Sequence, residues 1–462
     1  MTEVATEERP KTESAGPSGL SEELVRRVED ALEEGDIERA GEVAASLHAA
    51  DQADLLEQLR HEERLKLVAE LKPTLDPELL TYLDETVREE VLEQLTPEET
   101  GAAIAQLDTD DAIEVLGDLD ETEQIAILET LPMPERAAVE QGLTYPEDSA
   151  GRLMQRELVA APEFWTVGQT IDYLRAKPDL PDDFYDIYIV NPRFEPVGSI
   201  PLSKILRSRR GVLLTELKLK ERHLIPFDMD QEEVGFVFRQ YGLVSAPVVD
   251  ANRRLLGVIT VDDVVHVIEE EAEEDILKLG GVPEADIFAP PLRTSMHRVP
   301  WLLLNLCTAS LAALVVAQFE ATIREIVILA ALMPVVVSLG GNAGIQALTV
   351  TVRALALKQI TKANALRILG KELLAAGLNG LVLLIAGILL VLGWIGEVDL
   401  GVVFGAGIIL TIIVASLVGV TVPIVLDRIG LDPAVSSSVF VTTIADVFGF
   451  FAFLGLAALY LL

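Results

Sequence analysis

The sequence is poor in cysteine, in histidine and in positive charge, and these shortages exclude several classes of protein. Its only cysteine, Cys307, lies in an apolar stretch, so the chain forms no internal disulfide bond. Its 5 histidines are scattered, without the spacing of a zinc site. The first residues lack a basic segment followed by an apolar one, which excludes a typical secretory signal. With no nucleophile–base pair and no phosphate-binding loop, the sequence does not indicate an enzyme.

Charge is distributed very unevenly along the chain. The sequence has 74 Asp+Glu and 36 Lys+Arg, but residues 300–462 contain only 8 and 7 of these, which leaves a net charge of −37 on residues 1–299. Such a surface excludes nucleic acid as a partner, because a phosphate backbone requires positive charge. It favours cations instead. A solvated acidic surface adapted to high salt, in which lysine is scarce, explains most of these carboxylates equally well.

The last third of the chain predicts an all-α membrane domain. A spanning helix needs roughly 20 mainly apolar residues. Five segments joined by short polar connections meet this condition, which a helical core of a soluble protein does not explain: 299–319, 326–354, 369–395, 400–426 and 434–462. Basic residues cluster before the first span and between the second and third. This bias predicts a multi-pass protein of the inner (plasma) membrane with a cytoplasmic N-terminus and soluble region, and an outside C-terminus.

Polar residues recur every four positions in two of these spans, so each set lies on one helix face. The second span carries Ser338, Asn342 and Gln346, and the last span carries Ser438, Thr442 and Asp446. Glycines beside the first set allow either close helix packing or a local break in the helix.

Asp446 is the only acidic residue well inside a span. A charge there costs about 2.5–3.5 kcal/mol on insertion scales unless water or a cation compensates it, so it indicates a wet cation path. A protonated aspartate used in packing is the alternative. One carboxylate supplies too few ligands for a divalent ion, so we expect a homodimer that brings two copies of Asp446 together. With Asn342 and Thr442 nearby, this arrangement suits a hydrated magnesium ion.

Residues 151–263 contain a loose internal duplication, with copies at 151–215 and 216–263. Helix and strand patterns alternate in both, as in a βαβ-like α/β unit. The order resembles a tandem pair of CBS modules, which commonly sense adenine nucleotides or ions. That resemblance implies a ribose-binding Thr or Ser followed three positions later by Asp. Thr260 and Asp263 match it, whereas the first copy has Pro201 and Lys204. Bound ATP is therefore expected at the second copy only, and a structural pair without ligand is the alternative.

Residues 264–282 predict an acidic connecting helix. Residues 269–275 contain six acidic side chains, and Val264, Ile268, Ala272 and Ile276 share one face. Two such helices in a dimer would repel each other, and divalent cations would relieve the repulsion. A solvated acidic helix is the alternative. Residues 283–298 are expected to be a juxtamembrane linker.

Residues 20–150 predict an all-α domain of short amphipathic helices in a right-handed solenoid. Good capping residues such as Thr96 and Asp108 mark the helix starts. One helix carries the acidic residues Asp110, Asp111, Glu114 and Asp118. They form either a metal-sensing face or ordinary acidic residues favoured by the helix dipole. Residues 1–19 are expected to be disordered, because they have little to bury.

The order of helical repeat, CBS pair, acidic helix and five spans resembles the MgtE family of magnesium channels over nearly the whole chain. Residues 340–346 (GGNAGIQ) and 349–356 (TVTVRALA) look like the family's second-span motif, and residues 432–434 (DPA) and 442–447 (TTIADV) like its last-span motif. The resemblance implies a homodimer whose pore is built from these two spans. Asp446 is then the residue that holds hydrated magnesium, with Asn342 close by. The acidic helix is then a plug, which Asp432 links to the pore.

The resemblance also implies regulatory magnesium sites on the soluble region. The residues that match acidic sensing positions are Glu232, Asp263, Glu271, Glu274 and Asp275. His266 and Gly242 stand where an acid is common, and Ser438-Val439 replaces a small residue followed by proline. Magnesium is then both cargo and regulator: internal magnesium draws the acidic surfaces together and closes the pore. The alternatives are a divalent-cation transporter (Mg²⁺, Co²⁺ or Mn²⁺) coupled to an ion gradient, and a nucleotide-regulated conduit for another ion.

Overall fold

The computed structural model describes residues 20–178, 180–181, 184–219, 223–282, 291–434 and 437–462. The chain divides into two compact units after Ile268, and each unit is described by itself. Helix α15 (Val261–Gly280) belongs with its first residues to unit one and with the remainder to unit two. The segment 1–19, expected to be disordered, and residues 283–290 of the expected linker lie outside the described residues.

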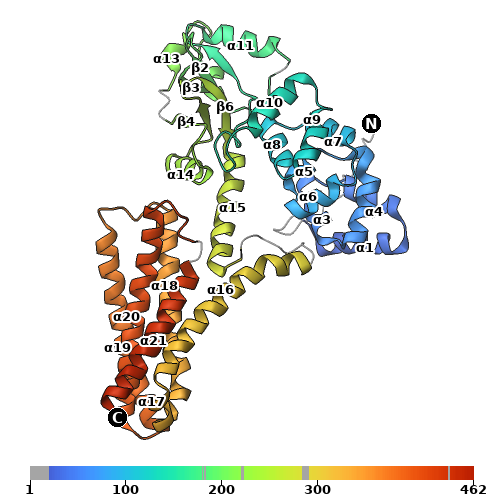
Figure 1. The fold of residues 1–462 in the computed structure, drawn as a ribbon. Helices are drawn as coiled ribbons and strands as arrows, with labels where there is room; N and C mark the ends of the chain where they lie inside the picture. The colour runs from blue at the N-terminus through green and yellow to red at the C-terminus, as the bar shows by residue number, and fades with distance from the viewer. Residues whose placement is uncertain (1–19, 179, 182–183, 220–222, 283–290, 435–436) are drawn as a thin grey trace, which may run out of the picture. The chain divides into compact units, whose positions relative to one another are not determined.

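Unit one begins with a stack of short helices (Figure 1). They are α1 (Glu22–Glu34), α2 (Ile37–Ala45), α3 (Ala49–Gln58), α4 (His61–Leu71), α5 (Leu79–Tyr82), α6 (Glu85–Leu92), α7 (Pro97–Ile104), α8 (Thr109–Gly117), α9 (Glu121–Leu128) and α10 (Met133–Leu143). The stack confirms the predicted helical-repeat domain. At α7 the side chains of Thr96 and Glu99 each accept a hydrogen bond from the other's backbone N–H, which stops the chain from fraying. Helix α10 was not predicted, although Pro132 and Pro134 at its start are compatible with a first helical turn.

Two three-stranded sheets of identical topology follow in unit one. Their strands are β1 (Ala160–Pro162), β2 (Asp186–Val190), β3 (Pro196–Pro201), β4 (Ile225–Pro226), β5 (Ser245–Val249) and β6 (Leu255–Thr260). In each sheet the first strand is parallel to the second, and the second is antiparallel to the third. The helices beside them are α11 (Val167–Ala176), α12 (Leu202–Leu206), α13 (Leu214–Leu217), α14 (Gln231–Tyr241) and α15. The pair of modules confirms the predicted duplication. Strands β1 and β4 were missed because two or three residues carry no periodic pattern.

Equivalent positions of the second and third strands lie 59 residues apart in the two sheets, as Asp186 and Ser245 do. The hydroxyl of Ser245 donates to Asp186 Oδ2 at 2.9 Å. A bulge falls at the same place in both sheets, between Ile189 and Val190 and between Val248 and Val249. The buried residues shared by the two copies are Tyr188, Val190, Leu255 and Val258. The two modules therefore pack as one body through matching strands.

The described residues of unit two include five helices that are long and apolar enough to cross a membrane. They are α16 (Pro291–Gln318), α18 (Ile328–Ala356), α19 (Ala365–Trp394), α20 (Val398–Arg428) and α21 (Ser437–Tyr460). A short helix that was not predicted, α17 (Glu320–Glu325), joins the first two. Residues 291–298 were assigned to the linker but form the first turns of α16. Pro291 suits a helix start because it has no N–H to satisfy there, and no glycine interrupts the residues that follow.

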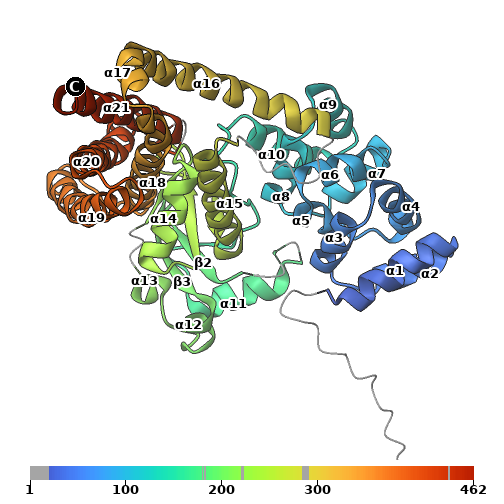
Figure 2. The same ribbon diagram turned by 90° about the horizontal axis from the view of Figure 1, so that it is seen from below.

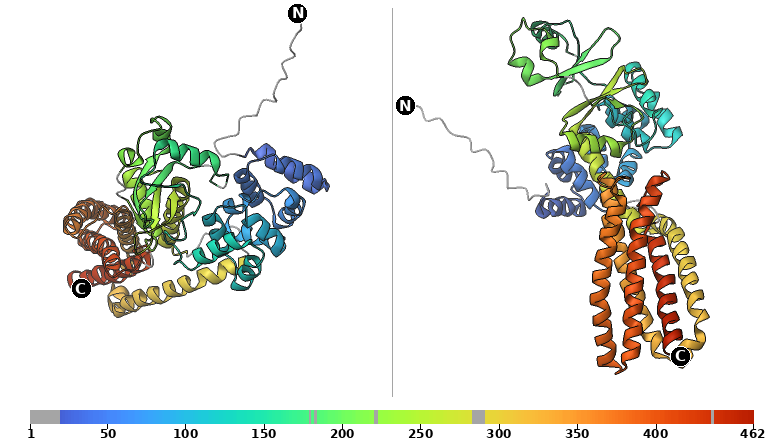
Figure 3. Two further views of the ribbon diagram at one scale, coloured as in Figure 1. Left: turned by 90° about the horizontal axis from the view of Figure 1, so that it is seen from above. Right: turned by 90° about the vertical axis from the view of Figure 1, so that its left-hand side faces the viewer.

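Helices α18 to α21 pack side by side, and Figure 2 shows them nearly end-on. Glycines let α18 approach its neighbours closely. A Cβ atom on Gly340 would lie 2.3 Å from Thr411 Cγ2, and one on Gly344 would lie 2.6 Å from Val441 Cγ1. Because α18 runs without interruption past these residues, the glycines serve packing and not a local break. The C-terminus lies at the same end of the bundle as α17 (Figure 3), as an odd number of spans requires.

Candidate ion path and acidic regulatory sites

Asp446 lies on α21, roughly 14 Å from the first residue of that helix at 1.5 Å per residue. Its side chain is half-buried. Among the residues that the structure describes, none forms a hydrogen bond or an ion pair with its carboxylate. A carboxylate inside a membrane span needs water, a cation or a partner.

The structure brings Asn342 and Asp446 to the same depth of the bundle. Two contacts between neighbouring helices fix the register: Gly344 against Val441, and Gly449 against Val337. These contacts make α18 and α21 antiparallel. Asn342 and Asp446 both lie between the two contact levels, so the amide and the carboxylate belong to one layer of the bundle.

The remaining polar side chains of the two spans extend this layer. Ser338, Asn342 and Gln346 are all exposed on the single chain. The hydroxyl of Thr442 donates to the backbone carbonyls of Ser438 at 2.9 Å and of Val439 at 3.2 Å. Its proton is therefore used within the helix, and its oxygen is left as an acceptor. An exposed polar face on a span requires either water or a second chain beside it.

Buried carboxylates gather where α8 meets the start of α15, within unit one. Asp110 is 8% exposed, and its Oδ1 has no hydrogen-bond partner in the described part of the chain. Burial, and after it the charge of Asp263, holds the pKa of Asp110 well above its usual range. Burial, again followed by Asp263, raises the pKa of Asp111 to about 7. Burial raises the pKa of Asp263 to about 6, despite a hydrogen bond from Thr260. The packing therefore favours a proton or a cation among these groups.

A further contact holds α8 in this position. Glu157, which precedes β1, accepts hydrogen bonds from the hydroxyl of Thr109 at 2.7 Å and from its backbone N–H at 3.3 Å. A carboxylate at a helix N-terminus is favoured by the helix dipole. The helical repeat is thus fastened to the CBS pair beside the acidic cluster.

The other two acids predicted on this helix have a different partner. Arg88 on α6 is 6% exposed, and it binds Glu114 at 2.8 Å and Asp118 at 3.0 Å. A buried guanidinium that is shared by two carboxylates stabilises the packing of successive repeats. The structure therefore separates Asp111, which faces Asp263, from Glu114 and Asp118, which bind Arg88.

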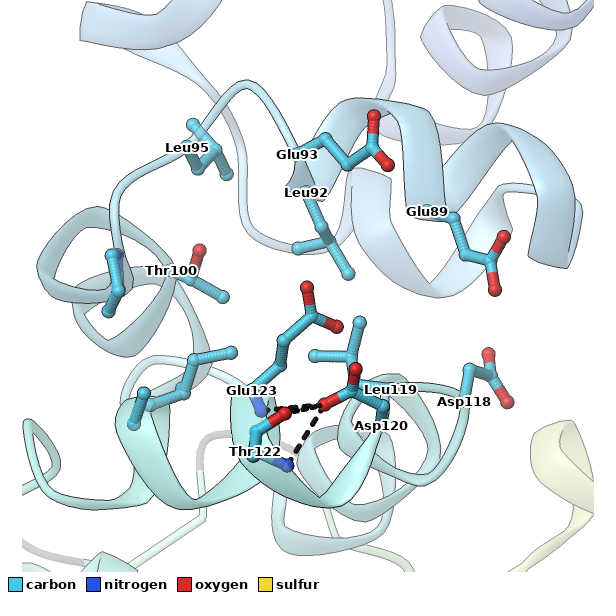
Figure 4. Close-up of a pocket in the computed structure, with 13 residues that line it drawn as sticks. Glu89, Leu92, Glu93, Leu95, Thr100, Asp118, Leu119, Asp120, Thr122 and Glu123 are labelled. Carbon is cyan, nitrogen blue, oxygen red and sulfur yellow. Dashed lines mark hydrogen bonds between the residues drawn. The ribbon is translucent and has the colours of Figure 1, made fainter.

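Beside these repeats the helical domain has a groove of about 930 Å³ (Figure 4). It lies between α6, α7 and α9, with an apolar floor and an acidic rim. Its labelled lining residues include Leu92, Leu95, Leu119, Glu89, Glu93, Asp118, Asp120 and Glu123. Asp120 caps α9 by accepting from the backbone N–H of Thr122 at 2.9 Å and of Glu123 at 3.0 Å. The sequence did not indicate this groove, because each repeat contributes only a few of its positions.

The two residues of the predicted ribose pattern bind each other. Thr260 Oγ1 donates to Asp263 Oδ2 at 2.6 Å. A ribose at this place would have to replace that hydrogen bond. In the first copy Lys204 Nζ donates to the carbonyl of Leu217 at 2.7 Å, so this position supports the module's own backbone. Glu232, predicted as a regulatory residue, lies in the first turn of α14, and its N–H donates to Asp230 at 2.9 Å.

The acidic end of α15 is joined to Asp432, which lies between α20 and α21, by a lysine that the sequence pattern did not single out. Lys278 Nζ lies 2.7 Å from Asp432 Oδ2 and also pairs with Glu274. Burial, and then the charge of Asp432, raises the pKa of Asp275. Glu271 lies half-buried on the same helix. Lys278 is the single lysine of α15 and follows Glu274 by four residues, a pattern that signals an ion pair.

The apolar stripe predicted along α15 is only partly covered. Val264 is buried, whereas Ile276 is 68% exposed. Within the described ranges, no group of three or more His, Cys, Asp or Glu is arranged to hold a metal ion. The acidic clusters of the described residues are therefore not completed coordination shells.

Asp446 is a carboxylate inside a membrane span, and it lies at the level of the polar face of α18. This arrangement suits the movement of ions and not enzymatic chemistry. The fold and this site are those of a multi-pass membrane transporter. Family models match three parts of the chain: MgtE, described as a divalent cation transporter, at residues 333–456, the MgtE intracellular N domain at residues 47–148, and the CBS domain at residues 220–270. The chain belongs to the MgtE family.

Relatives agree with this assignment. A magnesium transporter MgtE of Thermus thermophilus is 36% identical over 323 residues, which cover 69% of this chain and 71% of the relative. A protein of the same name from Enterococcus faecalis is 32% identical and covers 69% and 70% of the two chains. A solved structure of the cytosolic domain of the Mg²⁺ channel MgtE in complex with ATP is 31% identical and covers 53% of this chain and 99% of that one, with a TM-score of 0.48. Family membership thus makes the chain a transporter and not an enzyme.

Proposed function

We propose that this chain is a magnesium channel that works as a homodimer in the inner (plasma) membrane, with its soluble domains in the cytoplasm and its C-terminus outside. The observation that carries the proposal is Asp446, a half-buried carboxylate in a span, at the depth of Asn342. The relatives named magnesium transporters support Mg²⁺ as the cargo.

The chemistry of the ion explains why so few ligands suffice. Mg²⁺ gives up its water reluctantly and is often held by one or two carboxylates with water between. Two copies of Asp446 would supply these carboxylates. Asn342 and the Thr442 oxygen would accept or donate hydrogen bonds to the ion's water shell.

Closure by internal Mg²⁺ is the second part of the proposal. The facing carboxylates of Asp111 and Asp263 repel each other unless a cation or a proton lies between them. Mg²⁺ bound there and along Glu271, Glu274, Asp275 and Asp432 would stabilise the packed state. Because the ion binds the packed state better, it shifts the population towards closure. Glu232, Glu114 and Asp118 add acidic positions on the same unit, the last two through Arg88.

Nucleotide regulation would act at the same place. Thr260 and Asp263 are the residues that would bind the ribose of ATP. Asp263 also raises the pKa of Asp110 and Asp111 through its charge. ATP and a regulatory cation would therefore share one carboxylate, and each would change the affinity for the other.

The test is Mg²⁺ influx into liposomes that contain the full chain and a trapped dye. Asp446→Asn keeps the size of the side chain and removes its charge, and we expect it to lose most of the flux. Asp399→Asn is the matched control, since Asp399 is an exposed acid in the first turn of α20. Equal flux in wild type and Asp446→Asn would give Asp446 a structural role. Flux that stops when proton and sodium gradients are dissipated would instead indicate a coupled transporter.

A further inference from the structure

Lys278 is a fixed cation between two acidic segments of unit two. Its Nζ lies 2.7 Å from Asp432 Oδ2 and also pairs with Glu274, one turn earlier on α15. The side chain is only 21% exposed, so the ammonium group depends on these carboxylates for its stabilisation. Burial alone would lower the pKa of Lys278, but the hydrogen bonds that its ammonium group donates to Asp432 and Glu274 outweigh burial and raise that pKa.

Asp432 transmits this link to the backbone that leads into α21. Its Oδ1 accepts the N–H of Ala434 at 2.7 Å, while its Oδ2 binds Lys278. Ala434 belongs to a buried cluster with Leu348, Val352 and Val441. The residue after the lysine, Leu279, packs against the same cluster. Consecutive residues therefore attach the last turn of α15 to α18 and α21, one by an ionic contact and one by an apolar contact.

Carboxylates outnumber ammonium groups at the joint formed by Glu274, Asp275, Lys278 and Asp432. Glu274, Asp275 and Asp432 contribute three carboxylates. Lys278 contributes an ammonium group that pairs with Glu274 and Asp432 and, through its charge, lowers the pKa of Asp275. Without the lysine, three like charges would face one another, and an external cation would have to separate them. With it, a divalent cation must share or displace an ammonium group that is already bound.

We propose that Lys278 is a positioning residue of the gate, whose ammonium group holds Asp432 against α15 and competes with Mg²⁺ for Asp432 and Glu274. The inference rests on the proposed function, because it concerns how the channel closes. The lysine supplies part of the closing force without metal and weakens Mg²⁺ binding at this joint. Closure is therefore less steeply dependent on Mg²⁺ than it would be with a neutral residue at this position.

Mg²⁺ binding to the full chain in lipid nanodiscs tests the competition directly. Calorimetric titration with Mg²⁺ compares wild type, Lys278→Gln and Lys278→Arg. Lys278→Gln should raise the Mg²⁺ affinity at the joint by about tenfold, the size of a typical coupling between linked sites. Lys278→Arg keeps the charge and should match the wild type. In an Asp432→Asn background the lysine substitution should add much less, because one of the two carboxylates that lysine and Mg²⁺ share is gone. Unchanged Mg²⁺ affinity in Lys278→Gln with Asp432 intact would overturn the inference.

Flux through liposomes gives the second readout. Lys278→Gln should pass more Mg²⁺ than wild type at zero internal Mg²⁺ and show a steeper block as internal Mg²⁺ rises. Lys371→Gln, at an exposed lysine of the same unit, should behave as the wild type. A uniform change in flux at every internal Mg²⁺ level would make the lysine merely structural and refute its role in the gate.

Two arrangements keep the test decisive. If Lys278→Gln does not fold, Lys278→Met replaces it, since methionine keeps an apolar stem for the half-buried position. If the wild type itself carries no Mg²⁺, the proposed function fails. The binding cycle between Lys278 and Asp432 then still decides whether the lysine competes with the metal.

Discussion

The acidic cluster at α8 makes a quantitative prediction for Asp111→Asn. Burial and the charge of Asp263 move the pKa of Asp111 from its usual 3.8 to about 7 in the packed state. Keeping the carboxylate ionised there costs about 4 kcal/mol, at 1.36 kcal/mol for each pKa unit. Asparagine has the same shape and no charge. The variant should therefore hold α8 in its packed position more firmly than the wild type does.

The sign of the pH dependence follows from which state binds the proton more tightly. The pKa of Asp111 is higher in the packed state, so proton binding by Asp111 stabilises that state. This stabilisation is complete below pH 3.8 and is lost as the pH rises through about 7. The advantage of Asp111→Asn should thus be about 4 kcal/mol at pH 8 and about 2 kcal/mol at pH 5.

Hydrogen exchange of the α8 amides in the full chain, with Mg²⁺ chelated, measures this difference. Wild type and variant are compared at the same pH, so that intrinsic exchange rates cancel and only local opening differs. Glu121→Gln, at an exposed acid on the neighbouring α9, is the control and should change nothing. No slowing of exchange at pH 8, or the same slowing at both pH values, would refute the argument that Asp111 is held ionised against its environment.

Three further predictions concern packing and metal. Arg88→Met should destabilise the helical repeat by about 2–3 kcal/mol in thermal unfolding, because a buried guanidinium with two charged partners is lost. The control Arg136→Met removes a surface ion pair that contributes less than about 0.5 kcal/mol. Gly344→Val should abolish Mg²⁺ flux by forcing α18 away from a valine methyl group, while Gly341→Ala, with open space around its Cβ, should keep it. Adding Mg²⁺ to chelated protein should slow α8 hydrogen exchange in the wild type and much less in Asp111→Asn; equal slowing in both would remove Asp111 from the regulatory site.

The elements that the sequence predicted well are those with strong local signals. The span predicted at 369–395 is α19 (Ala365–Trp394), and the strand patterns predicted in the duplicated region include β6 (Leu255–Thr260). Long apolar runs and alternating apolar strands are visible in any window of the chain. Segments of two to four residues such as β4 and α13 are held by their neighbours in space, and nothing in their own residues indicates them.

Contacts between side chains that are far apart in the sequence could not be predicted from the sequence alone. Lys278 and Asp432 are 154 residues apart, and only the packing of α15 against the spans shows that they pair. Helical spacing placed Asp111 and Glu114 on one element, α8. It did not indicate which of the two a neighbouring domain would cover. The structure answers this with Asp263 beside the first and Arg88 beside the second. The depth shared by Asn342 and Asp446 was expected from the family resemblance and follows independently from two glycine contacts.

The 59-residue repeat of the CBS pair lets one copy specialise while the other keeps the fold together. Both copies must preserve the strands that meet at Tyr188 and Val258, because losing either would expose the shared apolar interface. Nothing in that interface requires both copies to retain a ligand site. The first copy is an example: at the position equivalent to Asp263, Lys204 donates a hydrogen bond to the carbonyl of Leu217. The second copy places the acid Asp263 beside Asp110 and Asp111 of the helical repeat. The two copies thus share one apolar interface, while the side chains at their ribose positions differ: Thr260 binds Asp263 in the second copy, and Lys204 binds the backbone in the first.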